Sequence, residues 1–107
     1  MNSVKREKIE EIIHRGAAEF IRDEASNSSL ITVTRVEMNV SGKDAIVYFT
    51  TLPESEEDTA LKFLDRKAPE FKQKMISESR IGIVPHLRFK IDYGERNRQR
   101  LDQLSKN

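Results

Sequence analysis

The chain has 107 residues, with 19 lysines and arginines against 18 aspartates and glutamates and a formal net charge of +1. This length suits one domain with a modest core. The absence of cysteine excludes disulfides and cysteine-ligated zinc or iron–sulfur sites. No apolar run approaches the roughly 20 residues that span a bilayer, and no apolar signal core stands at the start. We therefore expect a soluble, cytoplasmic domain that does not bind membranes.

Residues 4–25 are predicted to form the first helix. Apolar residues recur there at helical spacing and form one face: Ile9, Ile12, Ile13, Ala17, Phe20 and Ile21. Ser3 is the expected N-cap, because its hydroxyl can accept a hydrogen bond from an amide of the first turn. A polar turn is expected at 26–29.

Two strands are predicted next. Residues 30–40 are rich in β-branched side chains, but the apolar positions change parity between Val33 and Val36, which is compatible with a β-bulge. Residues 45–52 form the second strand. The short link between the two strands predicts an antiparallel hairpin.

The stretch 59–85 organises the rest of the chain. Its apolar residues form a single helical stripe: Leu61, Leu64, Ala68, Phe71 and Met75. Proline at position 69 has no N–H for the carbonyl of Asp65, which costs about 3 kcal/mol in a straight helix. We predict two half-helices with a kink at Lys67, Ala68 and Pro69. Either Ser55 or Asp58 is expected to cap the first half.

The last strand is expected near residues 83–93, after a turn at Gly82. Strict alternation assigns one set of side chains to an apolar face and another to a solvent face: Leu87, Phe89, Ile91 and Tyr93 against His86, Arg88, Lys90 and Asp92. Residues 1–94 would form the domain. Residues 95–107 would form a short charged tail, either a helix or a mobile segment.

The predicted order is α-β-β-α-β with a kinked second helix. Two helices must bury their apolar stripes, and a three-stranded sheet with one apolar face is the available partner. The fold class is therefore an α+β two-layer sandwich.

Catalysis is not expected from these residues. The two histidines, His14 and His86, fall at expected surface positions, and the chain has neither an HExxH motif nor a Walker-type glycine loop. The acidic run 54–58 lacks the ligand alternation of a calcium loop and fits a solvated helix start. We expect no enzyme activity, no metal site and no cofactor.

The basic bend is the best candidate for a binding site. A half-helix that begins at Pro69 would leave the N–H groups of residues 70–72 without partners, and such termini attract phosphate. Four bases surround the bend: Arg66, Lys67, Lys72 and Lys74. Glu70 would compete with a phosphate there, and charged helix faces are commonly only solvated. Both interpretations stay open from the residues alone.

A second basic group includes Arg88 and Lys90 on the last strand, followed by Arg96, Arg98 and Arg100. Lysine and arginine on an edge strand also serve to prevent sheet-to-sheet pairing, which needs no ligand. RNA contact and edge protection are both compatible with this pattern.

Three local patterns match a known family. The first pattern is Val33-Thr34-Arg35-Val36-Glu37-Met38, followed by Ala45, Val47-Tyr48, Thr50 and Leu52. The second pattern is Arg80, Ile83-Val84-Pro85, Leu87, Phe89 and Asp92. The third pattern is Lys8-Ile9. Through their order and spacing, over about residues 8–93, the chain resembles the ribosome-binding factor A family.

The resemblance implies a type II KH-like fold in which a bent second helix replaces the phosphate-gripping glycine loop of true KH domains. It also implies binding to the small (30S) ribosomal subunit near the 16S rRNA during late maturation, with a part in 16S 5′-end processing and growth in the cold. The family's Ala-x-Gly bend corresponds here to Lys67-Ala68-Pro69, and Lys72 matches the basic residue after it. Ser41 stands where the family commonly has an acid.

We therefore expect a monomeric ribosome assembly factor that contacts RNA through exposed lysine and arginine side chains. The candidate residues are Lys5, Arg6, Lys8, Arg66, Lys67, Lys72, Lys74, Arg80, Arg88 and Lys90. The alternative is a protein-interaction module that uses an edge strand or the sheet face around Ile46 and Tyr48. Salt dependence separates the two, because RNA docking weakens steeply with salt and apolar docking does not.

Overall fold

The computed structural model describes residues 2–25 and 30–105 of the chain. The elements are, in order, α1 (Ser3–Glu24), β1 (Leu30–Met38), β2 (Asp44–Leu52), the short 3-10 helix η1 (Glu54–Glu56), α2 (Glu57–Glu78), β3 (His86–Ile91) and α3 (Tyr93–Ser105). The predicted α-β-β-α-β order is confirmed. The turn predicted at 26–29 lies outside the described residues.

The three strands form one mixed sheet in the order β1-β2-β3. β1 and β2 are antiparallel, as predicted, and β3 runs parallel to β2. The register of β1 shifts between Val33 and Arg35, so the predicted bulge is confirmed. The extra residue lets Val33 and Val36 lie on the same face, opposite Phe49 and Val47 of β2.

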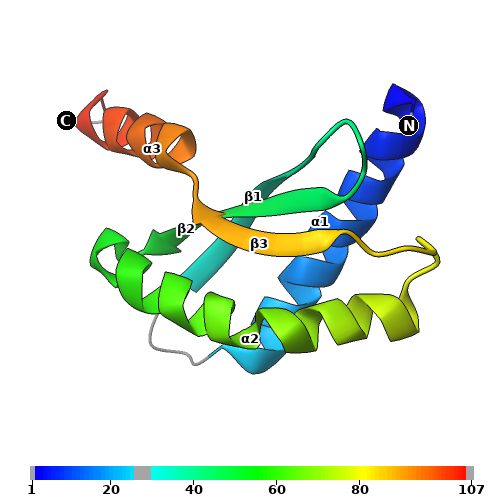
Figure 1. Ribbon diagram of the computed structural model, residues 1–107. Helices are drawn as coiled ribbons and strands as arrows, with labels where there is room; N and C mark the ends of the chain where they lie inside the picture. Colours follow the sequence, from blue (N-terminus) through cyan, green and yellow to red (C-terminus); the bar gives the residue numbers. More distant parts are fainter. Residues whose placement is uncertain (1, 26–29, 106–107) are drawn as a thin grey trace.

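Both long helices cover one face of the sheet, α1 against β1 and α2 against β3. Figure 1 shows this two-layer arrangement, with α3 projecting from the end of β3. The most deeply buried large side chains come from both layers: Phe49, Phe71, Ile13, Leu64 and Val47. The rings of Phe20 and Phe89 both contact Phe71, at 5.3 and 5.9 Å between centroids. The other face of the sheet stays open to solvent.

The predicted apolar stripes are largely confirmed. In α1 the exception is Ile12, which is 37% exposed at the edge of the buried face. The N-cap is Asn2, whose side chain accepts a 2.8 Å bond from the Lys5 amide, so the assignment of Ser3 was wrong. The predicted caps of α2, Ser55 and Asp58, were also wrong, because α2 begins at Glu57 after the 3-10 turn.

α2 is continuous from Glu57 to Glu78 with Pro69 inside it, so the two predicted halves are joined in one helix and the prediction that a second half-helix starts at Pro69 was wrong. Its axis changes direction along its length in Figure 1. The assignment of a kink to Lys67, Ala68 and Pro69 stays a prediction. Gly82 has a φ of +87° in the loop that leaves α2, as a turn at this position requires.

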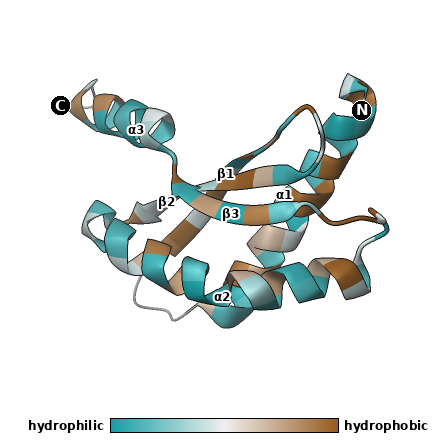
Figure 2. Cartoon of the chain, in the orientation of Figure 1, coloured by the Kyte–Doolittle hydropathy of each residue, from teal (hydrophilic) through white to brown (hydrophobic). Residues whose placement is uncertain are grey.

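The alternation of β3 is confirmed as far as Ile91, and Figure 2 shows hydrophobic and hydrophilic residues alternating along this strand. Beyond it the prediction was wrong for two residues. Asp92 is buried, and Tyr93 is 56% exposed. The physical reason is that the strand ends at Ile91 and the chain turns directly into α3, which starts at Tyr93. Of the two alternatives for the tail, the structure has the helix as far as Ser105.

Candidate nucleic-acid interface

The ten basic residues predicted to bind RNA do not form one surface. Lys5, Arg6 and Lys8 lie on the first two turns of α1, and Arg66, Lys67, Lys72 and Lys74 lie on α2. Arg80 lies in the loop that follows α2, and Arg88 and Lys90 lie on β3. The helices cover one face of the sheet, whereas the exposed side chains of β3 lie on the other. The predicted residues are therefore divided between the two sides of the molecule; we call the seven on α1 and α2 the helix region and the two on β3 the sheet region.

Two of the predicted residues instead link α1 to α2. The Lys67 ammonium lies 3.7 Å from Glu24 and 3.4 Å from Glu70. The Lys74 ammonium lies 3.7 Å from Glu19 on α1. Both side chains are largely covered, with 27% and 20% of their surface exposed. Their charges are already balanced by acids, which lowers their attraction for phosphate.

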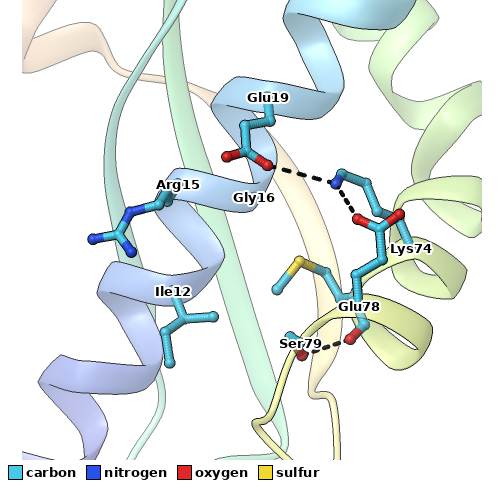
Figure 3. Close-up of a pocket in the computed structure, with 8 residues that line it drawn as sticks. Ile12, Arg15, Gly16, Glu19, Lys74, Glu78 and Ser79 are labelled. Carbon is cyan, nitrogen blue, oxygen red and sulfur yellow. Dashed lines mark hydrogen bonds and ion pairs between the residues drawn. The ribbon is translucent and has the colours of Figure 1, made fainter.

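Figure 3 shows the Lys74 ammonium between Glu19 and Glu78, beside a pocket between the two long helices. The Glu78 carboxylate, 2.5 Å away, raises the pKa of Lys74 above its ordinary value, and Glu19 adds to this effect against the opposing effect of burial. Lys74 therefore remains charged throughout the physiological range. It is better explained as a helix–helix contact than as an RNA contact.

The other eight predicted residues differ from these two. Each is exposed or half-buried, and within the described chain none lies within 4.0 Å of an acid oxygen: Lys5, Arg6, Lys8, Arg66, Lys72, Arg80, Arg88 and Lys90. Basic side chains without an acid partner are available to neutralise phosphates. They are the part of the predicted set that suits a polyanion.

The predicted phosphate site at the start of a second half-helix is absent. Because α2 is assigned as one helix through Pro69, residues 70–72 are interior positions and not a helix start. The concentration of unpartnered N–H groups that binds anions at a helix N-terminus does not arise there. Any attraction for phosphate at this place comes from side chains such as Arg66 and Lys72.

Sequence reasoning missed Arg35 and Tyr48 as candidate RNA contacts. Arg35 lies opposite Tyr48 in the β1–β2 register, and Tyr48 lies beside Lys90 in the β2–β3 register. The Arg35 guanidinium lies over the Tyr48 ring, 3.8 Å from its centroid, which is a cation–π contact. The parity change in β1 could have revealed it, because a bulge before Arg35 turns this side chain to the face opposite Val36.

The arginines of α3 are largely engaged by acids. Arg96 forms a 2.9 Å ion pair with Glu57, and Arg100 pairs with Glu54. The acidic run 54–58 is therefore not simply solvated, since the Glu57 side chain is only 12% exposed. Arg98 pairs within α3, and the neighbouring carboxylate of Glu95 raises the pKa of its guanidinium. These three arginines are less available to RNA than Arg88 and Lys90.

Within residues 2–25 and 30–105, no cluster of three or more histidine, aspartate or glutamate side chains is arranged to hold a metal ion. His14 is half-buried on α1, and His86 is exposed on β3. In the same residues, no helix is both long enough and apolar enough to cross a bilayer.

Over the described residues the fold is an α+β sandwich with three α-helices, one short 3-10 helix and a three-stranded mixed sheet, which is consistent with the predicted KH-like fold. A model of one family, ribosome-binding factor A, matches residues 5–105. The match covers almost the whole chain, so this chain belongs to the ribosome-binding factor A family.

Two curated relatives have similar sequences over nearly their full lengths. Ribosome-binding factor A of Staphylococcus epidermidis is 26% identical over 114 aligned residues, which include 100% of this chain and 98% of the relative. The protein of the same name from Macrococcus caseolyticus is 29% identical over 111 residues, with 97% of each chain covered.

Solved structures agree with the sequence comparison. The crystal structure of ribosome-binding factor A from Thermus thermophilus has a TM-score of 0.69 and 26% identity, over 78% of this chain and 92% of that one. A homology model of the Thermus thermophilus factor, fitted into a cryo-EM map of its complex with the 30S subunit, has a TM-score of 0.68 and 26% identity. It aligns with 78% of this chain and 90% of its own length.

Proposed function

We propose that this chain is a ribosome assembly factor that binds the small (30S) ribosomal subunit, contacts its 16S rRNA and assists its late maturation, including 16S rRNA processing. It acts by binding, without catalysis, as a cytoplasmic monomer. The observation that carries the proposal is the family match over residues 5–105, together with the similarity to a factor fitted into a map of a 30S complex.

The distribution of charge supports RNA as the partner. The formal net charge is only +1, yet many acids are used in internal pairs with Lys67, Lys74, Arg96 and Arg100. The basic residues left without an acid partner in the described chain include Lys5, Arg6 and Lys8 on α1, Arg66 and Lys72 on α2, and Arg88 and Lys90 on β3. Segregated charge of this kind produces local positive potential on a nearly neutral protein. Folded rRNA would then be recognised by its shape and phosphates more than by its base identity.

Single charge reversals test the helix region. We expect Arg66→Glu and Lys72→Glu each to weaken binding to purified small subunits by about ten-fold, because each removes a base and adds repulsion against phosphate. Cosedimentation over a salt series gives the affinity and its salt slope. Lys67 is left unchanged, because its reversal would break the pairs with Glu24 and Glu70.

Lys43→Glu is the matched control. This exposed lysine lies in the turn between β1 and β2, outside the candidate set, and like Arg66 and Lys72 it has no acid oxygen within 4.0 Å in the described chain, so its reversal changes the net charge by the same amount. Equal loss of binding in all three variants would show a general charge effect and contradict the assigned helix region. Failure of the wild-type chain to cosediment with small subunits at low salt would contradict the proposed function itself.

The role in processing needs a separate measurement. In cells that depend on this chain for growth in the cold, we expect Arg66→Glu to increase the fraction of 16S rRNA with an unprocessed 5′ end. Primer extension from small subunits gives that fraction. Wild-type processing in a variant that no longer binds subunits would separate binding from maturation and remove the second part of the proposal.

A further inference from the structure

The solvent-exposed face of the sheet carries two cross-strand rows. One row is Arg35, Tyr48 and Lys90, which are neighbours on β1, β2 and β3; the adjacent row is Glu37, Ile46 and Arg88. We call these six residues the open-face rows. Neither α1 nor α2 covers them, since both helices pack on the opposite face.

The Arg35 guanidinium is held in a fixed orientation. Its Nη1 donates a 2.7 Å bond to Glu37, its Nε donates a 3.3 Å bond to Asp92, and its inner surface lies on the Tyr48 ring. About half of the side chain, 51%, is exposed. A planar guanidinium that lies over an aromatic ring while half of its side chain remains exposed can serve as a stacking platform for a nucleobase.

Two basic residues without acid partners in the described chain lie near this platform. Arg88 and Lys90 are exposed and lie two residues apart on β3, so their side chains leave the same face about 7 Å apart. Three acids also lie on this face: Glu37, Asp44 and Asp92. Glu37 and Asp92 are both paired with Arg35, and Asp44 lies one row beyond Arg88, opposite His86. The end of the face around Tyr48 and Lys90 is therefore the basic end.

We propose that the open-face rows bind unpaired nucleotides of single-stranded RNA. A nucleobase would stack on Arg35, and Arg88 and Lys90 would bind the backbone phosphates. This inference rests on the proposed function, because RNA is the partner in both. The chemistry favours RNA over a protein. Protein interfaces have centres depleted of charge, whereas here Ile46 is the one aliphatic residue among the six.

The test uses fluorescence anisotropy with labelled octamers of adenylate, octamers of uridylate, and an RNA duplex of the same length. We expect the single strands to bind more tightly than the duplex, and octa-adenylate more tightly than octa-uridylate, because purines stack over a larger area. Equal or tighter binding of the duplex would overturn the proposal. So would the absence of octamer binding by the wild-type chain.

Two substitutions separate stacking from charge. Arg35→Lys keeps the positive charge and can still pair with Asp92, but it removes the planar surface. We expect about ten-fold weaker octamer binding with little change in salt slope. Lys90→Met should reduce the salt slope by about one, and Arg22→Ala should change neither quantity. If Arg35→Lys binds the octamers as tightly as the wild type, the stacking role is overturned. If Arg35→Lys unfolds at a lower temperature than the wild type, Lys90→Met alone tests whether this face of the sheet binds RNA.

The experiment also distinguishes the two levels of the proposal. Wild-type binding to small subunits, unaffected by Arg35→Lys and Lys90→Met, would overturn this inference and leave the proposed function in place. A photo-crosslinking side chain at position 46 should react with rRNA in the complex. Crosslinks to ribosomal protein alone would assign the open-face rows to a protein partner and overturn the RNA assignment.

Discussion

The hydroxyl of Thr34 donates a 2.6 Å hydrogen bond to Oδ2 of Asp92, a residue 58 positions later in the chain. Thr34 is the residue at which the β1 register shifts, so the bulge supplies the donor. Asp92 in turn accepts a 3.1 Å bond from the Glu95 amide, as an N-cap of α3 does. One carboxylate thus joins the bulge of β1, the end of β3 and the start of α3.

Removing this carboxylate should destabilise the protein. We expect Asp92→Ala to lower the free energy of unfolding by about 2–4 kcal/mol, because α3 loses its cap and the Thr34 hydroxyl loses its acceptor. Thr34→Val should cost about 1–2 kcal/mol. Urea denaturation followed by circular dichroism measures both. Thr32→Val is the control, since Thr32 is an exposed residue of the same strand, and an equal loss there would assign the effect to strand propensity.

The same carboxylate makes stability depend on pH. Burial alone would raise the pKa of Asp92, but the bonds from Thr34 and the Glu95 amide and the charge of Arg35 outweigh it and hold this pKa below its ordinary value. The stabilisation is therefore complete above the unfolded pKa of about 3.9 and is lost as pH falls through the lower folded pKa.

We expect the stability difference between the wild type and Asp92→Asn to be constant from pH 7 to 5 and to shrink below about pH 4. Parallel urea titrations at each pH measure this difference. A difference that grows on acidification would mean that Asp92 has a raised pKa, contrary to its hydrogen bonds.

Gly16 allows α1 and α2 to approach closely. A Cβ at this position would lie 2.6 Å from Sδ of Met75, which is itself buried on α2. Alanine improves helix propensity by up to about 1 kcal/mol, whereas the overlap costs about 1–3 kcal/mol, so we expect Gly16→Ala to be neutral or destabilising.

A double-mutant cycle with Met75→Ala isolates this contact. Once the sulfur is removed, Gly16→Ala should become stabilising, with a coupling energy of about 1–3 kcal/mol between the two positions. Ala18→Gly, at an exposed position of α1, calibrates the propensity effect. Additive effects of Gly16→Ala and Met75→Ala would mean that Met75 moves aside without cost.

The elements were predictable because their signals are local. Helical spacing identified α1 and α2, and the parity change in β1 identified the bulge between Val33 and Arg35. The composition of the site was less predictable, because it depends on which face each element presents. Nothing local indicates that Lys74 is paired with Glu19 on α1, 55 positions earlier, or that Arg35 covers Tyr48. These contacts arise only when the helices and strands pack together.

α3 is positioned mainly by charge, since none of its residues is buried. Arg96→Ala would leave the largely covered Glu57 carboxylate without its 2.9 Å partner, which we expect to cost about 1–3 kcal/mol. The amides of α3 should then exchange hydrogen faster while those of the core do not. Hydrogen–deuterium exchange measures this, with Arg98→Ala as the control, because its pairs lie within α3 and are exposed. Equal acceleration in both variants would contradict a role for Glu57 in holding α3.

Pro69 gives the last prediction. It is an exposed residue inside α2, between the buried Leu64 and Phe71, and it cannot donate to the carbonyl of Asp65. We expect Pro69→Ala to raise the free energy of unfolding by about 0.5–2 kcal/mol, less than the full proline penalty, because the buried side chains on both sides resist straightening of the helix. Urea denaturation measures the change.

Gln73→Ala, at another exposed position of α2, shows how much stability alanine adds without a new hydrogen bond. If Pro69→Ala is less stable than the wild type, the bend is required by the packing of Leu64 and Phe71 against the sheet. In that case proline lowers the cost of a bend that the core demands. If Pro69→Ala is more stable and binds small subunits less well, the bend serves binding and the proline is retained at the expense of stability.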